Sequence, residues 1–215
     1  MKPKLLTIGC SFTQGEELSD PERQSWPSLL AQEFDFELTN LGQSGASNDY
    51  IFRTAVESTV RNHYDLIIIQ WTEPSRVEVW SELNQQPVQI SANSGGPIVD
   101  QGLPWVKDYY KYSYNAFGSY RQWAVKIITL QQYFKSINQQ YLMTSLSGLN
   151  PYGHWSDFKE KLQHLWSRID TSCYPGWPHT GLSDWPLDAA TGPGGHPLEL
   201  GHERIANELK KYIRH

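Results

Sequence analysis

The sequence has few charged residues, few cysteines and no long apolar run. Charged residues make up 19% of its 215 residues and the net charge is −5, so the basic surface that nucleic-acid binding needs is missing. The apolar run after Lys2 and Lys4 is shorter than the roughly 7–15 residues of a secretory signal or the roughly 20 of a membrane span. We therefore expect a cytoplasmic protein without nucleic-acid or membrane partners.

The two cysteines, Cys10 and Cys173, lie far apart and neither belongs to a C-x-x-C pair. This usage fits a reducing compartment, although it also allows one long-range disulfide. The histidines lack the spacing of metal ligands, and we expect neither a metal nor a cofactor.

Aromatic residues, in contrast, are abundant, with nine tryptophans and twelve tyrosines. Some of them belong to the core, and others would line a surface that binds something flat, such as a sugar ring. The length fits one domain spanning residues 1–215.

Apolar runs typical of buried strands alternate with segments of helical periodicity. The strands are expected at Leu5–Ile8, Phe36–Leu41, Asp65–Trp71 and Gln140–Leu146, and the helices at Trp26–Phe34, Asn48–Asn62, Phe117–Phe134, Trp155–Ile169 and about Glu199–Ile213. This order predicts an α/β sandwich with a mainly parallel sheet, in which ligands bind beyond the carboxyl ends of the strands. Three segments follow strands at that edge: Gly9–Ser11, Gly42–Asn48 and Trp71–Arg76.

An irregular stretch interrupts this alternation at about residues 84–114. It mixes Pro, Gly, Asn and Gln with aromatic residues and shows no sustained period. Such an insertion is typical of a functional loop, a lid or a disordered segment.

Three short segments carry residues that could do chemistry. In "TIGCSFTQGEE" (7–17), Ser11 follows a strand and is either part of a turn or a nucleophile. In "NLGQSGASND" (40–49), glycines allow close backbone approach and Asn48 offers an amide donor, although Asn48 could equally cap the next helix. In "GGHPLELGHERIANEL" (194–209), His196 is a candidate general base or a solvated loop residue, and His202 is expected to be structural.

Together these segments resemble the SGNH hydrolases, the GDSL-type esterase and lipase superfamily, over nearly the whole chain. The motifs on which the resemblance rests are a strand followed by G-x-S, then N-x-G-x-x-G, then H-P-x-x-x-G-H before the last helix. The "GCSFTQG" form is similar to divergent members, some of them from bacteria and bacteriophages. The resemblance implies a three-layer α/β/α sandwich with a flavodoxin-like sheet of about five parallel strands.

The same resemblance assigns roles to individual residues. Ser11 would be the nucleophile and His196 the base, while the backbone N–H groups of Ser11 and Gly45 would form part of the oxyanion hole. Asn48 or Thr72 could supply a further donor.

Two positions depart from the family pattern. The family usually has an Asp three residues before the histidine, where this chain has Pro193. Asp188, Asp184 or a backbone carbonyl could orient the imidazole instead, or a Ser–His dyad could act alone.

The second departure is Glu73, which stands where the family has an asparagine that binds the oxyanion. An ionised carboxylate there would repel the oxyanion, so Glu73 must be protonated, point elsewhere or pair with a cation such as Arg76.

The expected function is that of a serine esterase acting on an acyl ester, with an O-acylated carbohydrate as the preferred substrate. Trp71, Glu73, Arg76 and Tyr110 are the expected substrate-binding residues. The alternative is a non-catalytic protein on the same scaffold that binds glycan or takes part in an assembly such as a phage particle.

Overall fold

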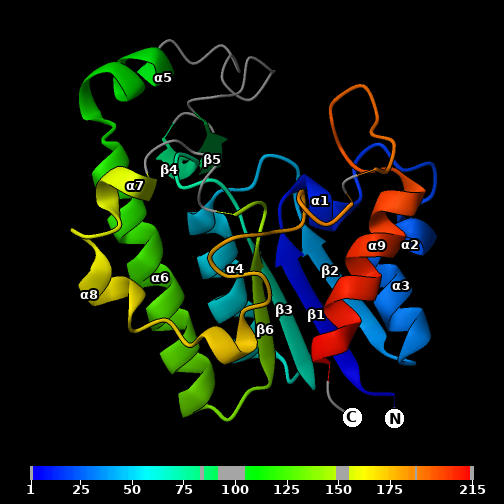
Figure 1. Ribbon diagram of the computed structural model, residues 1–215. Helices are drawn as coiled ribbons and strands as arrows, with labels where there is room; N and C mark the ends of the chain where they lie inside the picture. The colour runs from blue at the N-terminus through cyan, green and yellow to red at the C-terminus, as the bar shows by residue number, and fades with distance from the viewer. Residues whose placement is uncertain (1, 83–84, 92–104, 149–154, 187, 214–215) are drawn as a thin grey trace.

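The computed structural model describes residues 2–82, 85–91, 105–148, 155–186 and 188–213. Four strands form a parallel sheet in the order β2-β1-β3-β6 (Figure 1). Their bounds are Lys4–Gly9 for β1, Glu37–Gly42 for β2, Leu66–Trp71 for β3 and Tyr141–Ser145 for β6. The predicted parallel sheet is therefore confirmed, with four strands in the described part of the chain rather than about five.

Helices cover both faces of this sheet. The longer ones are α3 (Trp26–Glu33), α4 (Asn48–Arg61), α6 (Ala116–Ser136) and α9 (Glu199–Leu209). The short ones are α1 (Ser11–Gln14), α2 (Pro21–Gln24), α5 (Trp105–Asp108), α7 (Trp155–Phe158) and α8 (Gln163–Trp166), and single turns of π or 3-10 helix lie at Tyr109–Ser113, Thr171–Cys173 and Lys210–Tyr212. Figure 1 shows α4 and α6 on one face and α3 and α9 on the other.

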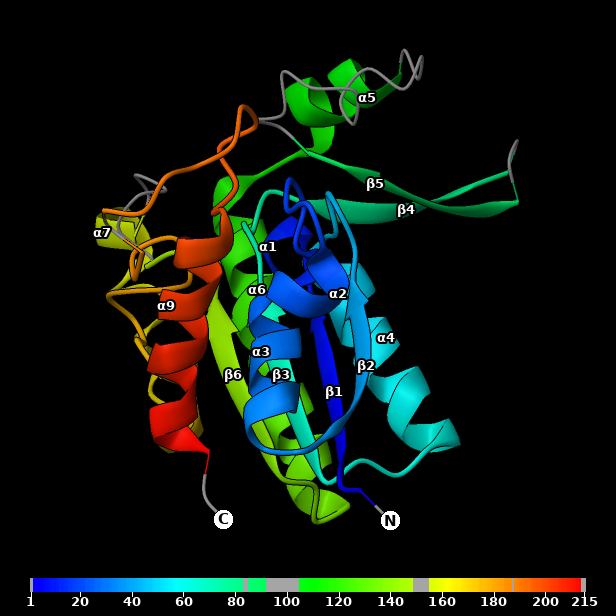
Figure 2. The same ribbon diagram turned by 90° about the vertical axis from the view of Figure 1, so that its right-hand side faces the viewer.

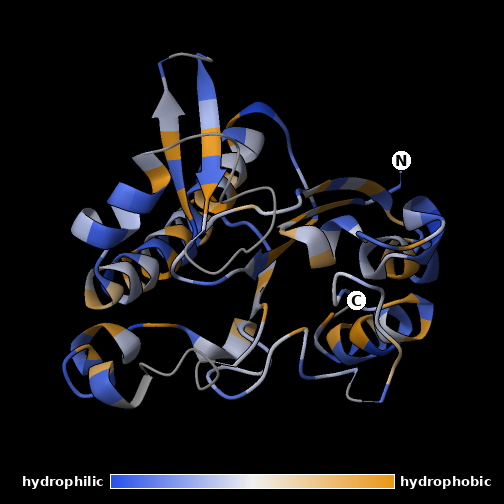
Figure 3. Ribbon diagram, turned by 90° about the horizontal axis from the view of Figure 1, so that it is seen from above, coloured by the Kyte–Doolittle hydropathy of each residue, from blue (hydrophilic) through white to orange (hydrophobic). Residues whose placement is uncertain are grey.

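Alternation along the strands explains the two layers of core. Successive side chains of a strand point to opposite faces, so Ile67 and Ile69 pack with α4 and α6 while Leu66 and Ile68 pack with α3 and α9. Viewed from above, the helices carry both hydrophobic and hydrophilic residues, as amphipathic helices should (Figure 3). His202 is fully buried in the second layer, where its Nδ1 accepts a hydrogen bond from the Trp26 N–H at 3.1 Å, which fits the structural role expected of it.

Two sequence expectations were wrong in detail. The single helix expected at Trp155–Ile169 is instead the two short helices α7 and α8. The irregular stretch at 84–114 contains β5 (Gln86–Ile90), which pairs antiparallel with β4 (Val77–Ser81) in a separate hairpin. Residues 84 and 92–104 of that stretch lie outside the described residues.

The β4–β5 hairpin lies across the top of the sheet, above α1 and α4 (Figure 2). A polar network ties it to the loop after β2: Gln89 Oε1 accepts from the Ser47 N–H at 2.9 Å, and Gln89 Nε2 donates to Glu78 Oε2 at 2.6 Å. Arg53 of α4 binds the same Glu78 carboxylate with Nε and Nη2, both at 2.9 Å. The hairpin is thus anchored to the carboxyl edge of the sheet.

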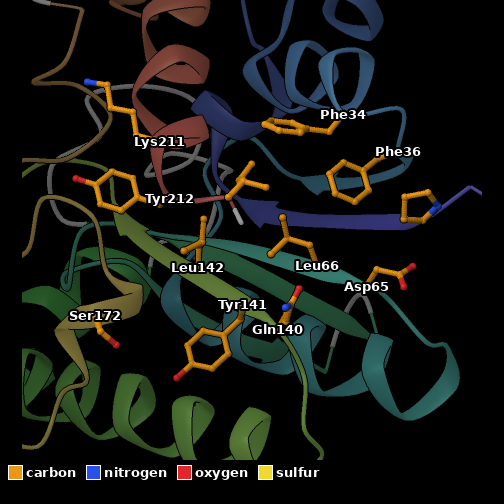
Figure 4. Close-up of a pocket in the computed structure, with 12 residues that line it drawn as sticks. Phe34, Phe36, Asp65, Leu66, Gln140, Tyr141, Leu142, Ser172, Lys211 and Tyr212 are labelled. Carbon is orange, nitrogen blue, oxygen red and sulfur yellow. The ribbon is translucent and has the colours of Figure 1, made fainter. Parts of the chain in front are cut away.

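A cavity of about 550 Å³ lies at the opposite edge, where the strands begin (Figure 4). Leu66, the first residue of β3, and Leu142, the second residue of β6, line it together with Phe34 and Phe36. Because the sequence motifs all follow strand ends, this cavity is separate from the site that they predict.

Both cysteine thiols are free, so the alternative of a long-range disulfide is wrong. In the part of the chain that the structure describes, none of the helices has the length and apolar character needed to cross a bilayer.

Candidate active site

The nucleophile candidate Ser11 opens α1, directly after β1. Gln70 of β3 holds this turn, because its Oε1 accepts from the Cys10 N–H and from Thr13 Oγ1, both at 2.9 Å. A Cβ on Gly9 would lie 2.2 Å from Thr13 Oγ1 and 2.5 Å from Gln70 Oε1, so only glycine allows this close approach. The conformation of this turn is therefore fixed by close packing and by side-chain hydrogen bonds.

His196 reaches this turn from the loop before α9. Its Nε2 lies 2.9 Å from Ser11 Oγ, and its ring packs against Phe12 with the centroids 5.6 Å apart. Ser11 is 5% exposed and the His196 side chain 18%. The structure thus brings together two residues that are 185 positions apart in the sequence, as the resemblance implied.

A third side chain, Glu17, completes this group. Its Oε2 lies 2.9 Å from His196 Nδ1, and it also accepts hydrogen bonds from the backbone N–H groups of Gly194 at 2.7 Å and His196 at 3.1 Å. An ionised carboxylate only accepts, so the proton of a neutral imidazole lies on Nδ1 and Nε2 can accept from Ser11 Oγ. These hydrogen bonds, the one from Gly194 most of all, hold the pKa of Glu17 below its ordinary value.

The residues proposed from the sequence for this role lie elsewhere. The side chain of Asp188 is 91% exposed and lies 4.0 Å from Arg204. Asp184 Oδ2 accepts from the N–H groups of Gly148 at 2.9 Å and Gly181 at 2.8 Å. The expectation that Asp188 orients the imidazole was therefore wrong, because Glu17 occupies that place.

Glu16 adds a second carboxylate on the other side of the ring. Its Oε2 lies 3.5 Å from His196 Nε2 and accepts from Ser44 Oγ at 2.6 Å. Gln14 accepts from the Ser44 N–H through Oε1, also at 2.6 Å. These contacts dock the loop after β2 onto the nucleophile turn.

Gly45 lies in that loop with a φ of +71°. The neighbouring Ala46 packs with Cys10 in a small apolar cluster, which keeps this loop next to the nucleophile turn. The placement agrees with an oxyanion-hole role for Gly45, which stays a prediction.

The Asn48 side chain is hydrogen-bonded to the backbone of the loop after β3. It is 3% exposed, and its amide donates to the carbonyls of Thr72 at 3.1 Å and Glu73 at 3.2 Å. Its Oδ1 accepts from the Thr72 N–H at 2.9 Å. Because both amide hydrogens are used by backbone carbonyls, the expectation that Asn48 donates to an oxyanion was wrong. Asn48 instead clamps the loop after β3.

Glu73 faces Arg76, one of the options that its sequence position left open. Glu73 Oε2 lies 4.0 Å from Arg76 Nε and 3.5 Å from Ser75 Oγ, from which it accepts. Both charged side chains are largely buried, 20% and 18% exposed. Binding of substrate by either residue remains a prediction.

Two aromatic residues that were expected to bind substrate, Trp71 and Tyr110, make packing and hydrogen-bond contacts within the protein. Trp71 is fully buried in the core and its Nε1 donates to Met143 Sδ at 3.5 Å, so a substrate-binding role for Trp71 was wrong. Tyr110 donates from its hydroxyl to the Ser75 carbonyl at 3.0 Å and contacts the rings of Tyr109 and Tyr114. Tyr110 thus packs the insertion onto the loop that carries Arg76.

Sequence reasoning missed Glu17, Glu16 and Gln70. One signal for the first two was their position directly after Gly15, inside the segment that carries Ser11. The signal for Gln70 was a polar residue at the end of an otherwise apolar buried strand. Within the described residues, no three His, Cys, Asp or Glu side chains are grouped as metal ligands would be.

No protein-family model matches the sequence, and none of the curated proteins compared with it gives a significant match. Solved structures do match. A lipolytic protein of the G-D-S-L family from Desulfitobacterium hafniense DCB-2 aligns with a TM-score of 0.56 at 14% identity, over 99% of this chain and 100% of that one.

Two further structures align over similar lengths. TesA has a TM-score of 0.59 at 13% identity, covering 98% of each chain. A variant of Axe2, an acetyl-xylooligosaccharide esterase from Geobacillus stearmophilus, has a TM-score of 0.55 at 16% identity, covering 99% of this chain and 95% of that one. This chain has the three-layer α/β fold of the SGNH, or GDSL-type, hydrolases.

Proposed function

We propose that this protein is a serine esterase of the SGNH type that cleaves acyl esters through an acyl-enzyme on Ser11. The observation that carries the proposal is the 2.9 Å contact between Ser11 Oγ and His196 Nε2, at the carboxyl edge of a parallel sheet. A serine hydroxyl is a weak nucleophile until a base takes its proton, and this geometry supplies the base.

The steps follow from that contact. Ser11 Oγ bonds to the ester carbonyl carbon while its proton passes to His196 Nε2. When the tetrahedral intermediate collapses, the bond to the leaving alcohol breaks and Nε2 returns the proton to the departing oxygen. Water then attacks the acyl-enzyme, giving its proton to Nε2, and the carboxylic acid leaves as Ser11 Oγ recovers a proton. The N–H groups of Ser11 and Gly45 are the proposed oxyanion donors.

The preferred substrate is an O-acylated carbohydrate. One of the similar structures is named as an acetyl-xylooligosaccharide esterase. Exposed aromatic side chains also lie on the hairpin and the insertion, with Trp80 58%, Trp105 39% and Tyr112 71% exposed. Such rings are suited to stacking on sugars.

The test is labelling with a fluorophosphonate probe, combined with hydrolysis of p-nitrophenyl acetate and of acetylated xylo- and manno-oligosaccharides. The wild-type protein should label and turn over, and Ser11→Ala and His196→Ala should do neither. Labelling that persists in Ser11→Ala, or a wild-type protein that neither labels nor hydrolyses any ester, would reject the proposal. The second result would favour the non-catalytic alternative, which glycan binding without turnover would support.

A further inference from the structure

We infer that Glu17 is the positioning residue of this site: it holds the His196 imidazole and also assembles the loop that carries it. The inference rests on the proposed function, because it assigns a role in the same reaction. It also explains how the site can work although Pro193 stands where an aspartate would be expected.

One carboxylate makes three of the contacts that define the His196 loop. Oε1 accepts from the Gly194 N–H, and Oε2 accepts from the His196 N–H and lies 2.9 Å from Nδ1. The loop closes on itself at the same place, where the Gly192 N–H donates to the His196 carbonyl at 2.9 Å. Backbone and imidazole are therefore fixed by the same group.

The loop is shaped around this carboxylate. A Cβ on Gly192 would lie 2.6 Å from Glu17 Cδ, and one on Gly194 would lie 3.1 Å from Glu17 Oε2. Glu17 itself has a φ of +69°, a left-handed conformation that is unfavourable for a residue with a side chain. Tertiary contacts must maintain it, and the three hydrogen bonds are such contacts.

The other carboxylates near this loop do not compete for the role. Asp188 is almost fully exposed and Asp184 is bonded to two backbone amides. Glu16 faces Nε2 rather than Nδ1, at 3.5 Å. Among the residues that the structure describes, Glu17 is thus the carboxylate that contacts His196 Nδ1.

This assignment places the nucleophile and the positioning carboxylate within one segment, residues 11–17. Gly15, with a φ of +87°, turns the chain after α1 and directs the following residues back towards the C-terminal loop. The C-terminal loop then needs to contribute only the histidine, so an aspartate three residues before it is dispensable.

The test compares Glu17→Gln with Asp188→Asn as the matched control, since each removes one charge without changing side-chain size. In p-nitrophenyl acetate hydrolysis, Glu17→Gln should lower kcat by about 10²–10⁴-fold with little change in KM, as expected for loss of a group that orients and stabilises the imidazolium. Asp188→Asn should retain wild-type kcat. Equal kcat values for Glu17→Gln and the wild type would overturn the inference.

Because loss of Glu17 also removes backbone hydrogen bonds, a second variant separates positioning from folding. Glu17→Ala should keep the wild-type circular dichroism spectrum, and added formate should restore part of its activity by supplying a carboxylate at Nδ1. The far-downfield proton NMR signal of the His196 Nδ1–H should be present in the wild type and absent from Glu17→Ala. No rescue by formate, together with an unchanged NMR signal, would overturn the inference.

The outcomes also separate this inference from the proposed function. A wild-type protein without Ser11-dependent labelling or turnover would reject the proposed function whatever Glu17 does. An active wild type whose activity does not depend on Glu17 would reject the role of Glu17 alone.

Discussion

Glu17 and Glu73 both lie at the carboxyl edge of the sheet, but they have different partners. Glu17 lies against the imidazole of His196 and accepts three hydrogen bonds. Glu73, after β3, lies instead by Arg76 and Ser75, with its Oε2 4.0 Å from Arg76 Nε and 3.5 Å from Ser75 Oγ. Glu17 compensates for the first departure from the SGNH pattern, the missing aspartate at position 193, whereas Glu73 is itself the second departure.

The sign of the charge explains the difference. The proposed reaction develops positive charge on the imidazole, which a carboxylate stabilises, and negative charge on the carbonyl oxygen, which a carboxylate repels. At 4 Å and an effective dielectric of about 20, that repulsion would be about 4 kcal/mol. An ionised glutamate can therefore take over the role of an aspartate at the histidine, but it cannot take over the role of an oxyanion-binding asparagine.

Apart from substitutions of Glu17 itself, the largest expected effect comes from forcing its carboxylate off the loop. The new methyl group of Gly192→Ala would lie 2.6–2.8 Å from the Glu17 carboxyl atoms, so the carboxylate must move. We expect kcat for p-nitrophenyl acetate to fall by about 10²–10³-fold, because the residue that positions the general base is displaced.

Gly195→Ala is the control for this prediction. Gly195 lies in the same loop with a φ of +84°, and its Cβ would have no neighbour within 4 Å. It should cost about 1–2 kcal/mol in stability while leaving Glu17 in place. If the two variants lose the same activity, the loss reflects the glycine backbone and not displacement of the carboxylate.

On the Glu73 side, the largest effect is expected from Asn48, which clamps the loop. Asn48→Ala leaves the Thr72 N–H and the carbonyls of Thr72 and Glu73 without their buried partner. We expect the free energy of unfolding in urea to fall by about 2–3 kcal/mol. Asn62→Ala, at the exposed end of the same helix, should change it by less than about 0.5 kcal/mol. Similar losses of unfolding free energy in the two variants would contradict the proposal that Asn48 holds the loop after β3.

The comparison also shows what the sequence can and cannot predict. Hydrophobic periodicity located the four parallel strands, and the spacing of short motifs indicated Ser11 and His196, because these features are local. The partner of His196 could not be found in that way. Pro193 shows that the usual aspartate is missing, but it does not indicate which distant side chain lies at the His196 Nδ1 atom instead. Trp71 illustrates the same limit, because an aromatic residue at a strand end suits a core as well as a binding site.

A smaller effect is expected from titrating Glu17. Its pKa is held below the ordinary value of 4.5, first by the Gly194 N–H, so its contribution to docking the His196 loop is complete above pH 4.5. The contribution is lost as the pH falls through the lowered pKa, because a protonated carboxyl accepts these bonds less well. Hydrogen-exchange protection factors of the Gly194 and His196 amides, corrected for intrinsic rates, should therefore fall below pH 4.5. Protection that is equally pH-dependent in Glu17→Gln would assign the change to another group.

The smallest effect is expected from Glu73→Gln, which removes the second charge of the comparison. The carboxylate lies 4.0 Å from Arg76 Nε, a long contact, and an ion pair of this kind contributes about 0–1 kcal/mol. We therefore expect kcat to stay within about threefold of the wild type, against the large loss expected for Glu17→Gln. A rise of tenfold or more would show that the Glu73 carboxylate repels the oxyanion in the working enzyme. A fall of tenfold or more would place Glu73 in the reaction itself, and the contrast between the two glutamates would then be wrong.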